Sequence, residues 1–365
     1  MKDIFWCSTC LNMSTRNRIE FDEKGRCNAC VWSDEKKTFN WDSREKELKT
    51  LIEKHRSKSG GFDLIVPVSG GKDGSYVTHT CKTRYGLNPL CVTVHPPIRS
   101  DIGHKNVENF KRAGFSLIEV NPPYETMQIL NKRGFIEQGR PLYGWTTGIF
   151  TSVIRIAKSL GITLIMYGED GEIEYGGSTE SKNKAVFSAE FVQRVYLEGQ
   201  VRDTFRDISP QDLFFWDFGI EGNSKIELSH WSYFENWDPY RNYLVAKEHC
   251  GLTEREDNNT GTYTNFAQND NLLYDLHTYL MYLKFGFGRG TQDVGIDVRR
   301  GSLSRDQGIE LVKLYDNHFP EEYLKDYLEY YRMTEKEFFD VLDRHVNRNL
   351  FEKQGKLWQP IFEIR

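Results

Sequence analysis

The sequence predicts an α/β fold: a parallel β-sheet with helices on both faces, preceded by a cysteine-rich module and followed by a mainly helical C-terminal region. Three observations predict it. Strand-like and helix-like segments alternate between residues 62 and 167, as in βα units. Four of the seven cysteines lie within the first 30 residues. The pattern after Ser304 is typical of successive helices.

Length and composition set the limits of this prediction. A chain of 365 residues is long enough for two or three units, and we expect boundaries at 1–40, 41–180 and 181–365. The net charge of −5 argues against a nucleic-acid partner. We see no run of roughly 20 apolar residues and no apolar signal region at the N-terminus. We therefore expect a cytoplasmic protein without a membrane partner.

The N-terminal cysteines have the spacing of a zinc ribbon. Cys7-x-x-Cys10 is followed, after 16 residues, by Cys27-x-x-Cys30. Two such pairs complete a tetrahedral cage of four thiolates, which leaves no open position for water, so we predict a structural Zn²⁺ that supports a neighbour or docks a partner. The alternatives are four ordinary thiols or two disulfides, and a reducing compartment disfavours disulfides.

The α/β unit is predicted element by element. Asp42 opens a helix with Glu45 as its capping-box partner, and the helix ends at Ser59-Gly60-Gly61. Strands and helices then alternate: strands at 62–68, 89–94, 116–120 and 162–167, and helices at 77–85, 106–113 and 148–160.

The C-terminal region begins with an aromatic segment, residues 210–244, and a polar loop at 257–270. Capping pairs Ser304 with Gln307 and Thr334 with Glu337 open later helices, the second of them the last. The aromatic side chains of the segment either pack in the core, which we favour, or stack on a ligand: Trp231, Tyr233, Phe234, Trp237 and Tyr240. The remaining cysteines are expected as small buried groups: Cys81, Cys91 and Cys250.

A glycine-rich loop is the strongest chemical signal. Val68-Ser69-Gly70-Gly71-Lys72-Asp73-Gly74-Ser75 follows the first strand and opens a helix. Paired glycines let the backbone approach an anion, and the helix N-terminus adds a positive field. The loop is neither a Walker A motif nor a dinucleotide fingerprint. The alternative is a plain strand-to-helix turn.

The loop resembles that of the PP-loop ATP pyrophosphatases, S-G-G-x-D-[ST]. The resemblance implies an adenine-nucleotide α-hydrolase-like fold, with ATP bound so that a substrate oxygen attacks the α-phosphorus and pyrophosphate leaves. Gly74 stands where Ser or Thr is usual. Either the hydroxyl of Ser75 or the backbone N–H of Gly74 would then take the role of the usual Ser or Thr hydroxyl.

Further blocks resemble one branch, the N-acetyl sugar amidotransferases of bacterial surface-polysaccharide and lipopolysaccharide O-antigen synthesis. Besides the cysteine pairs and the loop from Val66, they are Thr147-Gly148-Ile149-Phe150, Tyr167-Gly168-Glu169, Glu174-Tyr175-Gly176-Gly177, Lys284-Phe285-Gly286-Phe287-Gly288-Arg289, Asp293 and Asp297-Val298-Arg299. The resemblance implies conversion of an acetamido group of a UDP-linked sugar into an acetamidino group. It also implies a class I, histidine-biosynthesis-like glutaminase and a cyclase-like barrel as the source of ammonia, and a possible homodimer.

Candidate site residues follow from these blocks. Glu169 and Asp170 come just after the fourth strand, where ligands bind in open α/β sheets, unless they merely start a helix. Expected catalytic residues are Lys72, Asp73, Glu169, Lys284 and Arg289, and expected ATP contacts are Val68, Ser69, Gly70, Gly71, Lys72, Asp73, Gly74, Ser75, Val94, Gly148, Tyr167 and Gly168. Mg²⁺ bridging phosphate oxygens is expected.

Some of these groups have plainer interpretations. Lys284 and Arg289, with Arg299 and Arg300, either reach a pyrophosphate or sugar-nucleotide diphosphate or belong to a turn with solvated charges. His95 either lies near adenine or is an ordinary loop histidine. We find no convincing Cys–His–acid set, so no internal glutaminase is predicted.

Two other functions compete with the amidotransferase. A tRNA sulfur-transfer enzyme can also join zinc-binding cysteines to a PP-loop, but such enzymes commonly need further catalytic cysteines or an iron–sulfur cluster. The three remaining cysteines are isolated in sequence and the chain is acidic. A catalytically idle scaffold would explain Gly74 but not the intact Lys72-Asp73 pair.

Overall fold

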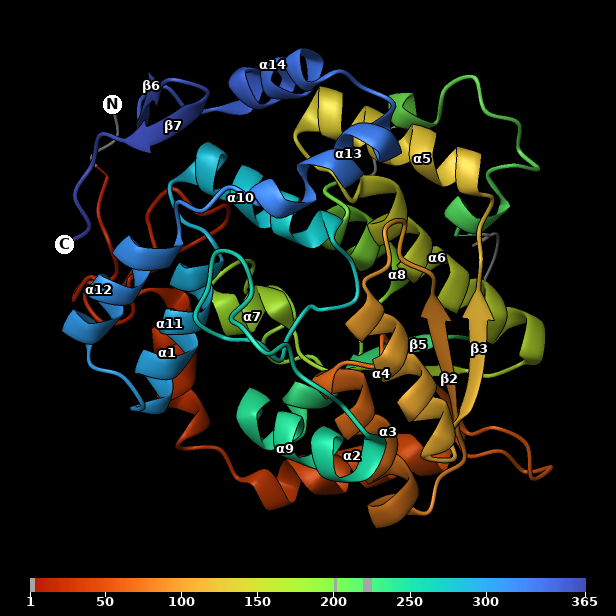
Figure 1. Ribbon diagram of the computed structural model, residues 1–365. Helices are drawn as coiled ribbons and strands as arrows, with labels where there is room; N and C mark the ends of the chain where they lie inside the picture. The colour runs from red at the N-terminus through yellow and green to blue at the C-terminus, as the bar shows by residue number, and fades with distance from the viewer. Residues whose placement is uncertain (1–3, 200–201, 219–224) are drawn as a thin grey trace.

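A five-stranded parallel sheet forms the centre of the α/β part (Figure 1). The computed structural model describes residues 4–199, 202–218 and 225–365. The strands, in the spatial order β3-β2-β1-β4-β5, are β1 (Leu64–Pro67), β2 (Pro89–Val94), β3 (Ser116–Val120), β4 (Leu164–Tyr167) and β5 (Glu227–His230). The predicted parallel sheet is therefore confirmed. β5 was not predicted, because its four residues, Glu-Leu-Ser-His, lack an apolar run.

Helices cover both faces of the sheet, as predicted. Alternate residues of β1 point to opposite sides: Leu64 and Val66 join one buried cluster and Ile65 another. The first cluster includes residues of α2 (Trp41–His55), α3 (Lys72–Tyr85), α4 (Asp101–Arg112) and α9 (Pro239–Cys250). The second includes residues of α6 (Tyr143–Leu160) and of the short α8 (Ala189–Phe191) and η2 (Val192–Tyr196).

Three helices begin earlier than the predicted ranges, and glycines interrupt the sequence pattern of each. α3 begins at Lys72, α4 at Asp101, capped by Ser100, and α6 at Tyr143. Gly103 and Gly144 interrupt the sequence patterns, but both serve close packing. A Cβ on Gly103 would lie 2.5 Å from the Asp270 Cα, and one on Gly144 would lie 2.7 Å from the Leu130 Cβ. Tertiary contact thus outweighs helix propensity at these positions.

The start of α2 also differs from the prediction. Its N-cap is Asn40, whose side chain accepts a hydrogen bond from the Ser43 N–H. Asp42 lies in the first helical turn and does not form the predicted capping box with Glu45. Asn and Asp are equally good N-cap residues, so the sequence alone did not show whether the N-cap is Asn40 or Asp42. The helix ends at His55, before the glycines.

The C-terminal half is mainly helical, with an added hairpin. Capping boxes at Ser304 with Gln307 and at Thr334 with Glu337 are present as predicted. The helices are α10 (Leu273–Phe285), α11 (Arg289–Arg300), α12 (Arg305–Tyr315), α13 (Leu324–Tyr331) and α14 (Glu335–His345), followed by the unpredicted antiparallel pair β6 (Phe351–Gln354) and β7 (Leu357–Pro360).

The C-terminal helices pack against the helices that lie between β3 and β4 in the chain. α5 (Tyr124–Arg133) contacts α6 and α13, and the π-helical turn η1 (Gly134–Gln138) contacts α6 and α14. Figure 1 shows α5 beside α13. Gln128 donates to the Tyr330 carbonyl at 2.6 Å, and Asn131 donates to the Tyr330 hydroxyl at 2.9 Å. The remaining short elements are α1 (Asn28–Lys36), α7 (Gly171–Tyr175), η3 (Arg202–Phe205), η4 (Phe214–Trp216), η5 (Trp231–Tyr233) and η6 (Glu321–Tyr323).

The aromatic segment serves mostly as core. Trp231, Phe234 and Trp237 are buried against α3 and the sheet, as favoured from the sequence. Residues 219–224 of this segment lie outside the described residues. Cys81, Cys91 and Cys250 are buried free thiols, also as predicted. None of the helices in the described ranges has the length and apolar character to span a membrane.

Gly74→Ala should destabilise the fold. Gly74 lies in the first turn of α3, and a Cβ there would be 2.8 Å from the Pro67 carbonyl oxygen and 3.0 Å from the Val68 Cγ1. Crowding of this kind costs about 1–3 kcal/mol. The matched control is Gly148→Ala on α6, where the nearest atom lies at 3.4 Å and the free energy of unfolding should stay unchanged or rise by up to about 1 kcal/mol. Urea denaturation measures both; equal effects would contradict the packing argument.

Candidate active site

A large cavity opens at the carboxyl ends of β1 and β4. From β1 the chain continues through β2 to β3 on one side, whereas β5 lies beyond β4 on the other. The strand order therefore reverses between β1 and β4, the place where ligands bind in open α/β sheets. The cavity measures about 700 Å³, within the range of pockets that hold small molecules and cofactors.

The glycine-rich loop lies at one end of this cavity. It joins β1 to α3, whose first N–H groups have no carbonyl partner within the helix and carry the positive end of its dipole. Gly70 has φ = +77°, and a Cβ there would lie 2.8 Å from the Val107 backbone nitrogen, so only glycine fits. The loop thus has the shape and field of an anion site.

Charged side chains gather beside the loop. Lys72 donates to Asp73 Oδ2, and Asn242 of α9 donates to Asp73 Oδ1 at 3.3 Å. Burial acts to lower the pKa of Lys72, but the carboxylates of Asp73, Glu169 and Asp293 outweigh it and raise that pKa. Lys72 is therefore firmly cationic within an acidic surrounding.

Glu169 stands out among the carboxylates. Burial, reinforced by the negative charge of Asp73, raises its pKa to about 7, although Lys72 and a hydrogen bond from Tyr175 act in the opposite direction. The Tyr175 hydroxyl donates to Glu169 Oε1 at 2.8 Å. A carboxyl group with such a pKa can gain or lose a proton near neutral pH.

The cavity has one apolar wall and one wall that combines polar and apolar side chains. The apolar wall comes from β2, α6 and β4: Val92, Val94, Trp145, Ile149, Val153 and Tyr167. The facing wall comes from the C-terminal half: Thr264, Phe266, Ala267, Gln268, Asp270, Tyr274, His277, Gln292, Asp293 and Ile296. Thr262 and Thr264 donate to Asp293 Oδ2 at 2.6 and 2.9 Å and hold it in place.

Most predicted site residues line this cavity: Val68, Ser69, Gly71, Lys72, Asp73, Gly74, Val94, Tyr167, Gly168 and Glu169. Gly70, Ser75, Gly148, Lys284 and Arg289 do not. Ser75 is fully buried in α3, and its hydroxyl does not reach the cavity, whereas Gly74 does. Of the two alternatives for the loop, the structure places Gly74 at the cavity.

The two predicted cations of the late block lie behind the cavity wall. Lys284 donates to the Gln138 carbonyl at 3.1 Å. Arg289 is buried and donates to the carbonyl of Ala267, which lines the cavity. His95 lies outside it as well, 2.7 Å from Glu119. Sequence spacing gave no signal for Asn242 or His277, since both come from helices far along the chain.

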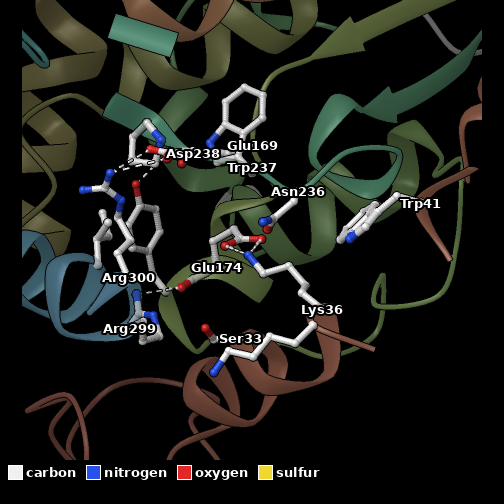
Figure 2. A pocket seen from close by; sticks show the side chains of 14 residues that line it. Ser33, Lys36, Trp41, Glu169, Glu174, Asn236, Trp237, Asp238, Arg299 and Arg300 are labelled. Carbon is white, nitrogen blue, oxygen red and sulfur yellow. Dashed lines mark hydrogen bonds and ion pairs between the residues drawn. The ribbon is translucent and has the colours of Figure 1, made fainter. Parts of the chain in front are cut away.

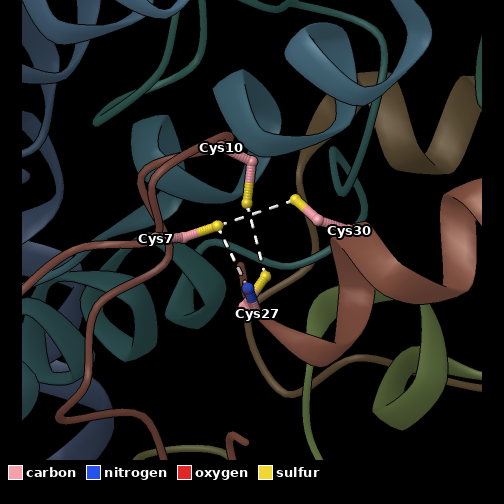
Figure 3. A group of neighbouring side chains, drawn as sticks. All are labelled: Cys7, Cys10, Cys27 and Cys30. Carbon is pink, nitrogen blue, oxygen red and sulfur yellow. Dashed lines mark hydrogen bonds between the residues drawn. The ribbon is translucent and has the colours of Figure 1, made fainter. Parts of the chain in front are cut away.

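The four N-terminal cysteines converge on one point (Figure 3). Their sulfur atoms all lie within 4.8 Å of one another, with 3.7 Å between Cys7 and Cys30 and 3.5 Å between Cys10 and Cys27. Zn–S bonds of about 2.3 Å in a tetrahedron would separate the sulfurs by about 3.8 Å. The cluster therefore fits a structural metal such as zinc.

The surroundings of the cluster suit thiolates. Backbone N–H groups of Cys27 and Thr9 donate to Cys7 Sγ at 3.2 and 3.4 Å, and Asn12 donates to Cys27 Sγ at 3.4 Å. Burial acts to lower the pKa of Arg299, but the nearby thiolates raise it, so this guanidinium balances their charge. Such donors and counter-charges stabilise metal-bound sulfur.

The cysteine module packs directly on α7, beside the large cavity. Asn12 and Asn28 donate to the Tyr175 and Gly177 carbonyls at 3.0 and 2.8 Å. Trp32 and Lys36 both contact the Glu174 carboxylate, at 2.9 and 2.7 Å. The module thus supports the helix that carries Tyr175 to Glu169.

Two comparisons with known proteins bear on this chain. Residues 260–365, under a third of the chain, match the family described as LPS biosynthesis protein WbpG-like, C-terminal domain. The chain is also similar to an uncharacterised protein of Methanocaldococcus jannaschii, with 28% identity over 175 residues. That alignment covers 47% of this chain and 61% of the relative, so the chain spans less than two thirds of the relative's length.

Cys10→Ser should reduce both metal content and stability. We expect the purified chain to carry about one zinc ion, because a closed set of four sulfurs binds it tightly. The variant should lose zinc and melt at a lower temperature. Cys81→Ser, also a buried thiol but outside the cluster, should keep the zinc. Elemental analysis and thermal melting measure this; full zinc content in Cys10→Ser would contradict the assignment.

Glu169→Gln should alter how stability depends on pH. Because the pKa of Glu169 is about 7 in the folded chain and ordinarily 4.5, the folded state keeps its proton in this interval while the unfolded chain has released it. The wild-type free energy of unfolding should fall by on the order of 1–3 kcal/mol between about pH 4.5 and 7 on this account. The glutamine variant should lack that fall.

Urea denaturation of both proteins at about pH 5 and about pH 8 measures this difference. The variant should gain stability relative to wild type at the higher pH. Parallel pH profiles would show that Glu169 titrates normally.

Proposed function

We propose that this chain is an ATP-dependent amidotransferase of surface-polysaccharide synthesis, which converts the acetamido group of an N-acetyl sugar into an acetamidino group and releases AMP and pyrophosphate. The main support is the position of the Ser69–Asp73 loop at the point where the strand order reverses, with Lys72 facing the cavity. The similarity of residues 260–365 to an LPS biosynthesis domain supports the polysaccharide role.

The cavity suits ATP in shape and polarity. The apolar wall formed by Val92, Val94 and Ile149 offers a surface for the adenine base. The loop and the N-terminus of α3 offer N–H donors for the pyrophosphate. The carboxylates of Asp73 and Asp293 are oxygen donors of the kind that Mg²⁺ prefers, and the ion would neutralise phosphate charge there.

The reaction activates a poor leaving group. The amide oxygen attacks the α-phosphorus, a P–O bond to pyrophosphate breaks, and the amide N–H proton is released, giving an O-adenylyl imidate. Ammonia then adds to the imidate carbon, the C–O bond breaks, and AMP leaves with the former amide oxygen. The proton lost by ammonia can be taken up by the amidine product or by a nearby base.

The residues have distinct roles in this scheme. Lys72 and the first N–H groups of α3 stabilise the negative charge that develops on the departing pyrophosphate. Asp73, fixed by Asn242, orients the Lys72 ammonium. Glu169, with its raised pKa and its Tyr175 hydrogen bond, accepts the proton released at the amide or at ammonia.

The ammonia requires a source outside this chain. We propose a class I glutaminase resembling that of histidine biosynthesis, acting through a cyclase-like barrel partner. The acceptor is proposed to be UDP-linked, and the protein is proposed to be cytoplasmic and to form a homodimer. A sulfur-transfer reaction is disfavoured, because none of the residues lining the cavity in the described part of the chain is a cysteine.

The reaction is tested by its products. The protein is incubated with ATP, ammonium and a panel of UDP-N-acetyl sugars, and the products are analysed by mass spectrometry. Exchange of one oxygen for one NH at an acetamido group, with equal amounts of AMP, is expected. AMP formation that depends on tRNA instead would overturn the proposal.

Lys72→Ala should abolish AMP formation without unfolding the protein. Loss of a group that stabilises transition-state charge typically reduces turnover by about 10²–10³-fold. The control is Lys82→Ala on the same helix, whose ammonium donates to the Gly114 carbonyl at 3.0 Å away from the cavity. Zinc content should be the same in both variants. Unchanged turnover in Lys72→Ala would remove the loop from the mechanism.

A further inference from the structure

A second cavity, of about 390 Å³, adjoins the first. The two share Glu169, Tyr175, Pro239 and Ile296 as lining residues. The hydrogen-bonded pair of Glu169 and Tyr175 therefore stands between them. Figure 2 shows this second cavity, with α1 on one side and the Arg299 and Arg300 side chains of α11 on another. It is a separate space that reaches the same carboxyl group as the loop cavity.

The cysteine module supplies one wall of the second cavity. Ser33, Lys36 and Lys37, at the end of α1, line it. Cys27 is the N-cap of α1, and Cys30 lies in its first turn. The position of this wall thus depends directly on two of the four clustered cysteines.

Cationic and aromatic groups dominate the lining. Lys36, Lys37 and Arg300 face Glu174 and Asp238, which leaves one positive charge in excess when Glu169 is protonated, while the charge of Arg299 balances the nearby thiolates. Trp41 and Trp237 add aromatic surface. Lys36 is paired with Glu174 at 2.7 Å, whereas Arg300 makes only longer contacts, at 3.3 Å to Asp297 and Ser302 and at 3.4 Å to Asp238. An anionic ligand would therefore give Arg300 a shorter ion pair than it has now.

Two buried donors of the lining lack a partner among the described residues. Arg299 Nη1 and Trp237 Nε1 are both inaccessible and make no hydrogen bond. Trp237 is only 6% exposed. Unsatisfied buried donors are costly. Both belong to lining residues, so a small side-chain shift on ligand binding would bring them to acceptor oxygens of the ligand.

We propose that the second cavity binds the acceptor, an anionic N-acetyl sugar, and that the role of the cysteine module is to form one wall of this cavity. This inference rests on the proposed function. The anionic group, either the diphosphate of a sugar nucleotide or the carboxylate of an acidic sugar, contacts Lys37 and Arg300. The sugar packs on Trp41 or Trp237, and the acetamido group points to Glu169 and Tyr175, beyond which lies the loop.

The test is direct binding, measured by calorimetry with three probes: UDP-N-acetylglucosamine, N-acetylneuraminic acid and neutral N-acetylglucosamine. Lys37→Glu and Arg300→Gln are compared with the control Lys313→Glu. Lys37 and Lys313 are both exposed and both form i,i+3 ion pairs, with Asp34 at 2.7 Å and Glu310 at 3.0 Å, but only Lys37 lines the cavity. The control therefore makes the same charge change elsewhere.

The expected result is that at least one anionic sugar binds more tightly than the neutral one. Its Kd should rise roughly five- to tenfold in Lys37→Glu and in Arg300→Gln, while the Kd for ATP stays unchanged and Lys313→Glu resembles wild type. Whichever anionic sugar binds identifies the source of the anionic group.

Other results overturn the inference. These are failure of both anionic sugars to bind wild type, an unchanged Kd in both cavity variants, or equal binding of the neutral sugar. AMP formation, assayed on the same samples, judges the proposed function separately. Binding that depends on Lys37 but without AMP formation supports the acceptor site and overturns the proposed adenylation. AMP formation with an unchanged Kd in both cavity variants supports the adenylation and overturns the acceptor site.

Discussion

The burial of one ammonium group among several carboxylates is the constraint on which the site depends. Lys72 lies at the start of α3, beside Asp73, and within electrostatic reach of Glu169 and Asp293. One buried cation does not balance these acids, and burial together with the charge of Asp73 raises the pKa of Glu169 to about 7. Such a site can admit a polyphosphate only together with further positive charge, which explains why a divalent cation belongs in the proposed reaction.

The four segments that create this environment are far apart in sequence. β1 and α3 bring the loop, β4 brings Glu169, α9 brings Asn242 to Asp73, and α11 brings Asp293. The cysteine module holds α7 in place through Asn12 and Asn28 and so positions Tyr175. The four-cysteine cluster, remote from the loop, is thus connected through α7 to the carboxyl group between the two cavities.

Local patterns predicted the sheet and the loop because their signals are short-range. Four strands, two capping boxes and the cysteine spacing depend on neighbouring residues, and all appear in the structure. The misses depend on tertiary contacts. Gly103 and Gly144 lie inside helices because packing requires it, and β5 is a strand because β4 offers it a paired edge.

The candidate site shows the same division between short-range sequence signals and tertiary contacts. The loop and Glu169, which the sequence puts directly after strands, line the large cavity. Lys284 and Arg289 lie behind its wall, although their glycine-flanked block suggested a phosphate contact. No spacing rule could place Lys37, just after α1, and Arg300 of α11 around one cavity, since 262 residues lie between them and only the folded chain brings them together.

The most direct test of the account follows the oxygen atom of the acetamido group. An N-acetyl sugar substrate is prepared with heavy oxygen in that carbonyl and incubated with ATP, ammonium and the protein. If the amide oxygen attacks the α-phosphorus, mass spectrometry will find the heavy oxygen in the phosphate of AMP and none in the pyrophosphate or the sugar product. AMP without the label, or label retained in the sugar, would contradict adenylation of the amide.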